Sequence, residues 1–253
     1  MSSRRDRILE EMGLGPVWRL RVAADAEHGS AAAEADHNSV KTVVPELASM
    51  GAPAGDERAA RIMQLDWSAL REAVATCEAC ALSKTRTNTV FGVGDEQAEW
   101  LLVGEAPGAE EDTRGEPFVG QAGRLLDNML AAVGLRRGEN VYIANVLKCR
   151  PPGNRNPEPL EVERCSPHLE RQIDLIGPKL VIAMGRFAAQ TLLGTDASIA
   201  SLRGRLHRYR GVPLIVTYHP AYLLRNLPDK AKAWEDLLFA RATMRTLGGQ
   251  LPI

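Results

Sequence analysis

The stretch EWLLVGEAPG, residues 99–108, runs from a short apolar segment into a turn of glycine and proline. A short apolar run bounded by turn residues is typical of a strand that is buried on both faces. Three more runs share the pattern: NVYIANVLKC (140–149), PKLVIAMG (178–185) and VPLIVTYHP (212–220). Because helical patterns separate these runs, the sequence predicts an α/β domain with a mostly parallel sheet.

The composition is that of an ordinary soluble chain. The 253 residues are 45% hydrophobic and 25% charged, with a formal net charge of -1, so any positive surface must be local. No apolar run reaches the roughly 20 residues that span a bilayer, and the charged N-terminus lacks the apolar core of a secretion signal. We therefore expect a cytoplasmic protein, without a membrane segment.

Three regions follow one another along the chain. Residues 1–21 form a charged segment with helical apolar spacing, and residues 22–65 are rich in Ala, Gly, Ser and acidic residues, which predicts a flexible linker. Asp66 can cap the next helix, so we expect the folded domain to occupy residues 66–253.

The four cysteines suggest a metal or cluster site. A reducing compartment disfavours structural disulfides, and a C-x-x-C pair with two further cysteines can supply four thiolates. Both zinc and a [4Fe–4S] cluster accept such a set, and the spacing does not separate them; four unrelated buried thiols are the alternative. The candidate ligands are Cys77, Cys80, Cys149 and Cys165.

Polar groups gather where the predicted strands end. Glu105 lies in a turn whose glycines allow close backbone approach, Phe118 lies in a nearby loop, Asn145 ends an apolar strand, and His219 ends the last one. Taken alone, Glu105, Phe118 and His219 are each more often structural than functional, and Asn145 is as often one as the other. Together, near the carboxyl edge of one sheet where α/β proteins bind ligands, they suit a flat, hydrogen-bonding heterocycle.

The segment 197–228 contains no acidic residue. This pattern indicates either a solvated face balanced by acids elsewhere or an edge that contacts phosphates. The segment carries two histidines, His207 and His219, and the arginines Arg203, Arg205, Arg208, Arg210 and Arg225.

Three longer strings strengthen the functional reading: GEAPGAEEDTRGEPFVGQAGRLLDNML (104–130), NVLKCRPPGNRNPEP (145–159) and HPAYLLRN (219–226). With the cysteines in matching places, the chain resembles the uracil-DNA glycosylase superfamily, and specifically its iron–sulfur branch, family four, over about residues 67–247. The resemblance implies a three-layer α/β/α fold with a four-stranded parallel sheet. It also implies a structural [4Fe–4S] cluster rather than zinc.

The resemblance also implies roles for the strand-end residues. Glu105 resembles the residue that orients the attacking water or stabilises the cationic sugar, and Phe118 resembles the ring on which a flipped uracil stacks. Asn145 resembles the amide that reads the base, and His219 resembles the histidine that stabilises the leaving base. The backbone at Gly104 and Gly108 is expected to approach the base.

The substrate implied is uracil in single- or double-stranded DNA, released during base excision repair. By default we expect a monomer, associated with the nucleoid in the cytoplasm. Leu223, or the adjacent Leu224, is placed like the wedge that fills the gap left by the flipped nucleotide. The loop 150–159 has no histidine, so we expect turnover rather than a covalent adduct. The expected phosphate contacts are Arg150, Arg155, Arg203 and Arg225.

Two departures from the best-known branch of the superfamily bear on the mechanism. Ala106 stands where that branch has an aspartate, and Gly108 replaces the bulky residue that excludes thymine. The alternatives are the same fold acting on hypoxanthine or xanthine, an iron–sulfur redox protein, and a non-catalytic iron–sulfur protein that binds DNA. No G-x-G-x-x-G fingerprint supports the redox reading.

Residues 3–21, SRRDRILEEMGLGPVWRLR, resemble the N-terminal peptide of the psi subunit of the bacterial polymerase III clamp loader, offset by one inserted residue. This resemblance implies that the segment tethers the domain to a clamp-loader ATPase subunit. An unstructured tail without a partner is the alternative.

Overall fold

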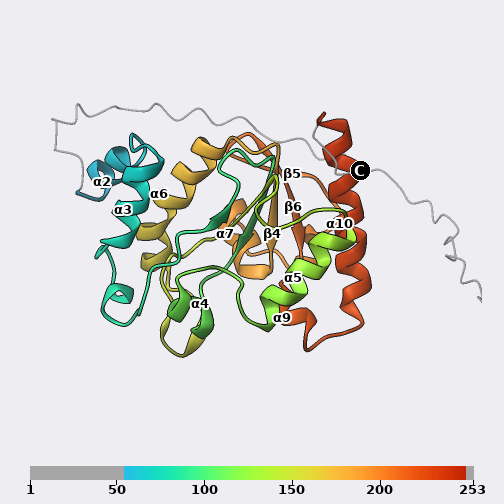
Figure 1. The fold of residues 1–253 in the computed structure, drawn as a ribbon, viewed down its shortest axis with the longest axis horizontal. Helices are drawn as coiled ribbons and strands as arrows, with labels where there is room; N and C mark the ends of the chain where they lie inside the picture. The colour runs from blue at the N-terminus through green and yellow to red at the C-terminus, as the bar shows by residue number, and fades with distance from the viewer. Residues whose placement is uncertain (1–53, 249–253) are drawn as a thin grey trace, which may run out of the picture. The chain divides into compact units, whose positions relative to one another are not determined.

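A computed structural model describes residues 54–248 (Figure 1). The tether expected at residues 1–21 and most of the expected linker lie outside these residues, so both stay predictions. Within residues 54–248, no helix combines the length and the apolar character needed to cross a membrane.

The centre of the fold is a mixed sheet with the strand order β1-β3-β2-β4-β6-β5. The inner four strands are parallel, as the sequence predicts. The two edge strands pair antiparallel and were not predicted, because two or three residues are too few to show a period. The strands are β1 (Val93–Gly94), β2 (Trp100–Gly104), β3 (Val141–Asn145), β4 (Leu180–Met184), β5 (His207–Tyr209) and β6 (Val212–Thr217).

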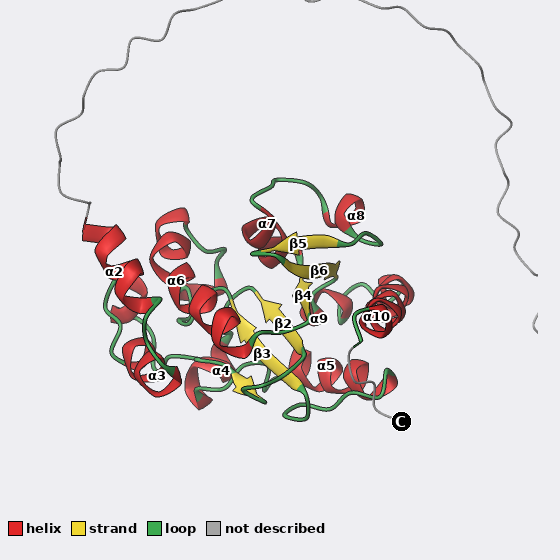
Figure 2. Ribbon diagram, turned by 90° about the horizontal axis from the view of Figure 1, so that it is seen from above, coloured by secondary structure: helices red, strands yellow, loops and turns green. Residues whose placement is uncertain are grey.

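Helices cover both faces of the sheet, which gives the expected three layers (Figure 2). Leu101 and Val103 of β2 pack with α6 and α7, whereas Trp100 and Leu102 pack with α5 and α10. Burial on both faces explains why the strands are apolar throughout. The helices are α2 (Ala54–Ile62), α3 (Trp67–Ala75), α4 (Ala109–Arg114), α5 (Gln121–Ala132), α6 (Pro159–Ile176), α7 (Arg186–Leu193), α8 (Ile199–Leu202), α9 (Pro220–Leu223) and α10 (Asp229–Thr246).

Helix α2 lies inside the range 22–65 that was expected to be a linker. Its Ile62 is 4% exposed and belongs to a small core with α3, and its Arg58 donates to the carbonyl of Arg164 in α6 at 2.8 Å. The described order therefore begins by Ala54 rather than at Asp66. Among residues 57–62 of α2, whose burial the structure describes, only Ile62 is a buried apolar side chain, which is too little periodicity to distinguish the helix from the alanine-rich segment before it.

The carboxyl ends of the parallel strands meet at one edge. Gly104 and Asn145 are partners in the register, as are Met184 and Thr217. The pairing continues past the strands, because the Leu147 amide donates to the carbonyl of Glu105 at 3.1 Å. This places the turns that follow β2, β3, β4 and β6 side by side.

A buried ion pair joins the segment after α8 to α10. Arg203 donates from Nε to Asp236 at 2.7 Å, with side chains only 13% and 2% exposed, and its guanidinium lies 5.1 Å from the ring centre of Tyr218. Glu235, 74% exposed, stands 3.7 Å from the same guanidinium. Arg203 is thus a structural residue of this layer.

Asp236→Ala should lower the free energy of unfolding by about 3–5 kcal/mol, since it leaves a buried guanidinium without its anion. Glu235→Ala, which removes an exposed neighbour of the same arginine, should cost less than about 1 kcal/mol. Urea denaturation measures both changes. Equal effects of the two substitutions would contradict the assignment of the buried pair as the stabilising one.

Candidate functional site

Three elements meet at Gly104. A Cβ atom there would collide with Oδ1 of Asn145 and lie 2.7 Å from Cζ of Phe118. The ring of Phe118 in turn stacks against that of His219, with centroids 5.4 Å apart and planes 29° from parallel. The structure therefore brings four predicted residues together. We use the name strand-end pocket for this group of residues, Gly104, Phe118, Asn145 and His219, where the sequence predicts that a base binds.

Asn145 presents an unpaired acceptor in this pocket. The residue is 2% exposed, and its Oδ1 has no hydrogen-bond partner among the described residues. Buried polar atoms are nearly always paired, so an orphan acceptor calls for an explanation. A ligand that offers a planar N–H donor would satisfy it.

The position of the Phe118 ring depends on an unusual backbone conformation. Phe118 has a φ of 56°, in the left-handed region that is uncommon for a bulky residue. Arg137 fixes this conformation by donating to the carbonyls of Pro117 and Phe118, both at 2.8 Å. A Cβ at Gly123 would overlap the Phe118 carbonyl, so α5 can approach the loop only through glycine.

Glu111 joins the two loops that frame the pocket. One carboxylate oxygen accepts from the amide of Gly108 at 3.1 Å, and the other accepts from the amides of Val119 at 3.1 Å and Gly120 at 3.3 Å. The sequence reasoning missed Glu111, because nothing distinguishes it from the neighbouring acids Glu110 and Asp112 before the loops are folded together.

The hydrogen bonding of His219 defines its tautomer. Its Nδ1 accepts from the amide of Ala221 at 3.1 Å at the start of α9, so the neutral ring carries its proton on Nε2. Burial lowers the pKa of His219 to about 4; the charge of Arg225 acts in the same direction, and that of Glu111 opposes it. The ring is therefore a neutral donor at physiological pH.

Glu105 follows Gly104 at the strand edge. Burial raises the pKa of its carboxyl group, and the charge of Arg186 partly offsets this effect. Partial burial destabilises the charged form of this carboxyl group. A positive charge that forms beside it would stabilise the carboxylate.

The exposure of the two leucines proposed as the DNA wedge differs from the expectation. Leu223 is 1% exposed and packs with Tyr218 and Ala233, so it cannot enter a DNA stack in this conformation. Leu224 is 38% exposed and becomes the better candidate for the wedge.

Two of the four expected phosphate contacts are already paired inside the protein. Arg155 forms two hydrogen bonds to Glu161, at 2.6 and 2.9 Å, and Arg203 is bound by Asp236. Both guanidinium groups therefore already have an anionic partner, which makes them weaker candidates for phosphate contacts than the other two. Arg150 donates to the neutral amide of Asn154 at 2.7 Å, and Arg225 is exposed with no ion-pair partner among the described residues, so these two keep their charge for a ligand.

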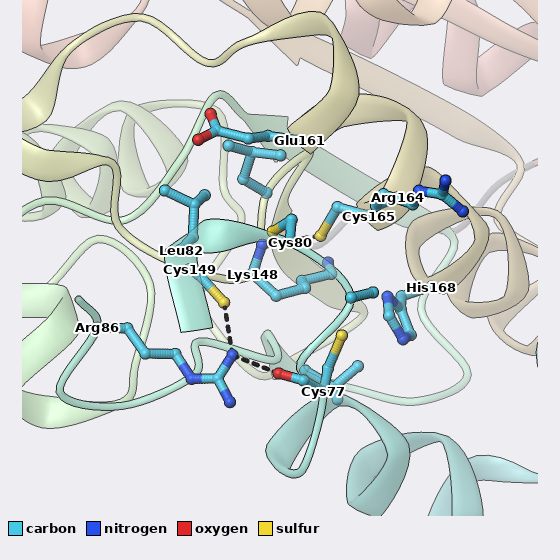
Figure 3. Close-up of a pocket in the computed structure, with 13 residues that line it drawn as sticks. Cys77, Cys80, Leu82, Arg86, Lys148, Cys149, Glu161, Arg164, Cys165 and His168 are labelled. Carbon is cyan, nitrogen blue, oxygen red and sulfur yellow. Dashed lines mark hydrogen bonds between the residues drawn. The ribbon is translucent and has the colours of Figure 1, made fainter. Parts of the chain in front are cut away.

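The four cysteines line one pocket behind the end of β3, which we call the four-thiol site (Figure 3). They come from the turn after α3, the turn after β3, and helix α6, as the spacing predicts. Cations and amides face the sulfurs: Arg86 donates to Cys149 at 3.1 Å, Arg58 to Cys77 at 3.4 Å, and the Lys148 amide to Cys165 at 3.3 Å.

This arrangement favours thiolates that are bound to a positive centre. Burial raises the pKa of Cys149 and raises that of Cys165 to about 12, so free thiols would stay protonated there. No three Cys, His, Asp or Glu side chains within residues 54–248 are grouped as ligands of a single ion. Tetrahedral zinc would require sulfurs about 3.8 Å apart. The four thiols and the donors that face them have the chemistry of a thiolate-bound metal group, which both zinc and a [4Fe–4S] cluster accept.

The fold and the strand-end pocket define an α/β/α protein with an unpaired amide oxygen and an aromatic ring at the carboxyl edge of its sheet. Comparison with known families makes this specific: residues 91–238 match the model of the uracil DNA glycosylase superfamily, and the chain belongs to that superfamily. The predicted resemblance to this superfamily is thereby confirmed.

Curated relatives agree. The chain is 50% identical over 159 residues to the Type-4 uracil-DNA glycosylase of Archaeoglobus fulgidus, a match covering 60% of this chain and 79% of the relative. It is 42% identical over 181 residues to that of Thermotoga maritima, covering 70% and 94%. A Type-5 uracil-DNA glycosylase of Thermus thermophilus is 33% identical over 153 residues, covering 51% and 68%.

The titration of His219 tests the pocket electrostatics. Because its pKa is lowered to about 4, the ring should stay neutral and protonated on Nε2 from about pH 8 down to about pH 5. Nitrogen-15 NMR of the imidazole reports both features. Arg225→Ala should raise this pKa, because it removes a neighbouring positive charge. A ring that titrates near 6.5 in the wild type would contradict the assignment.

Proposed function

We propose that this chain flips uracil out of DNA and hydrolyses its N-glycosidic bond, leaving an abasic site for base excision repair. The observation that carries the proposal is the unpaired, buried acceptor of Asn145 beside the Phe118 ring at Gly104. A base inside a duplex cannot reach such a pocket, so it must be extruded first. Membership of the superfamily and the Type-4 relatives support the same reaction.

The Asn145 amide selects the base by the arrangement of its hydrogen-bond donor and acceptor. Uracil offers an N3–H donor next to its O4 acceptor; Asn145 accepts the first at Oδ1 and donates to the second from Nδ2. Cytosine presents the reverse pattern, which would leave buried groups unpaired. Gly108 provides no bulk against the methyl group of thymine, so its exclusion falls to the Phe118 loop that Glu111 holds in place.

The bond is broken by stabilising two developing charges. Negative charge that forms on uracil O2 is met by the Nε2–H of His219, which is neutral and already oriented through Nδ1. Positive charge on the sugar is met by the carboxylate of Glu105, which also orients the attacking water. His219 therefore acts as a fixed hydrogen-bond donor and needs no net proton transfer.

The surface that faces DNA carries the remaining roles. Leu224 fills the space left by the flipped nucleotide, and Arg150 and Arg225 contact phosphates. The enzyme works as a monomer at the nucleoid, turns over without a covalent adduct, and is tethered through residues 3–21 to a clamp-loader ATPase subunit.

The four-thiol site holds a [4Fe–4S] cluster. The cysteines would be its ligands, and the donors from Arg58, Arg86 and the Lys148 amide would stabilise its negative charge. When bound, the cluster cross-links α6 to the turns that follow α3 and β3. It supplies rigidity rather than electrons for the reaction.

Release of free base from oligonucleotides tests the function. Asn145→Ala and His219→Ala should each slow uracil release by about 10²–10³-fold, the usual cost of losing one transition-state donor. Asn128→Ala, which removes an exposed amide on α5, should leave the rate unchanged.

The same assay separates the alternatives. Release of hypoxanthine or xanthine in the absence of uracil release would show the same fold with another substrate. Binding to DNA without release of any base would indicate a non-catalytic protein. Near-normal rates in both pocket variants would refute the pocket.

Metal analysis tests the cluster. The purified protein should be brown, with iron and sulfide in equal amounts, and Cys149→Ser should lose both together with thermal stability. Ser166→Ala, adjacent to Cys165 in α6, should keep them. A colourless wild type with one zinc per chain would overturn the assignment.

A further inference from the structure

Lys148 is a buried lysine between the two sites. It is 1% exposed and lies in the turn after β3, three residues beyond Asn145 and directly before Cys149. Its ammonium group donates to the backbone carbonyl of Asn145 at 2.9 Å and to Oε1 of Gln172 at 2.6 Å. Among the described residues it has no carboxylate partner, which is an expensive arrangement for a buried charge.

Gln172 anchors the other end of this contact. It is fully buried in α6, and its Nε2 donates to the carbonyl of Phe91 at 2.9 Å and approaches the hydroxyl of Tyr142 at 3.5 Å. The amide orientation is thereby fixed, with Oε1 left to accept from Lys148. The ammonium position is set by α6 and β3 together.

The carbonyl of Asn145, which accepts from Lys148, belongs to the residue whose side chain lies in the strand-end pocket. β3 ends at this residue, and the following amide, of Val146, already pairs with the carbonyl of Gly104. The plane of the peptide unit that links Asn145 to Val146 is thus held on both sides, by Gly104 at its amide and by Lys148 at its carbonyl, and it adjoins the Cα atom from which the Asn145 side chain projects. A rotation of that plane would move Oδ1 away from Gly104 and out of the pocket.

The four-thiol site supplies the missing negative charge. The backbone amide of Lys148 donates to the sulfur of Cys165 at 3.3 Å, and Figure 3 shows its side chain among the cysteines. A cluster held by four thiolates is anionic, so its charge offsets that of the buried ammonium.

We propose that Lys148 is a positioning residue that orients Asn145 for base recognition, with the four-thiol site as its counter-charge. This rests on the proposed function and gives that site a purpose beyond cross-linking. Loss of the cluster would then weaken base reading without removing any group that touches uracil.

A double-mutant cycle tests the proposal. In single-turnover assays, Lys148→Met should slow uracil release about tenfold, whereas DNA affinity changes less than about twofold. In an Asn145→Ala background, Lys148→Met should have less than about a twofold effect, because the group it positions is gone. Lys148→Arg should restore part of the rate, since it keeps the charge and donors.

Controls separate positioning from stability. Ile173→Val trims the core of the same helix and should change neither rate nor affinity. Iron content and visible absorbance are measured for every variant. If Lys148→Met fails to fold or loses its cluster, Gln172→Met, which removes only the side-chain acceptor of Lys148, is compared in the same two backgrounds.

The outcomes are distinct. Equal effects in the two backgrounds, or a full wild-type rate in folded Lys148→Met, would overturn the positioning role. An apo protein, made by removing iron, that reads uracil as well as the loaded form would overturn the link to the four-thiol site. A wild type that releases no uracil would instead refute the proposed function.

Discussion

The close approach at Gly104 is the constraint on which the site depends. Register pairs Gly104 of β2 with Asn145 of β3, so the two strand ends are adjacent, and only the missing side chain of Gly104 lets the Asn145 amide and the Phe118 ring meet there. The unusual backbone of Phe118, the donors of Arg137 and the glycine in α5 all serve that contact. Strain at Phe118 is thus compensated by hydrogen bonds to its own loop.

Strand β3 connects two kinds of chemistry. It ends in Asn145, and four residues later the same chain supplies Cys149 to the four-thiol site. The intervening turn is buried, with Val146, Leu147 and Lys148 each at most 1% exposed. A displacement of the cysteine therefore cannot be absorbed by a flexible loop and is transmitted to the strand end. A group bound at the four-thiol site would therefore affect base recognition without touching the base.

The sequence predicted the parts of this site that have local signals. Buried strands, the turn after β2 and the polar strand ends are visible as patterns, and the topology of parallel sheets brings such ends together. Glu111, Arg137 and Lys148 escaped prediction because the groups that they bond, most of them backbone carbonyls and amides, come close only in the fold. The edge strands and α2 escaped because they are too short or too poor in buried apolar residues to show a period.

The arginines of the acid-free segment 197–228 have different surroundings in the folded protein. Of its five arginines, Arg203 and Arg210 pair with acids on α10 and α6, as the solvated-face reading expects. Arg205 precedes β5, and because β5 runs antiparallel to β6, it lies toward the same edge as His219. Only Arg205 and Arg225 then bring unpaired charge from this segment to the pocket edge. Two unpaired arginines would release few counterions on binding DNA, and phosphate contacts carry no sequence information, so base selectivity would rest on the strand-end pocket.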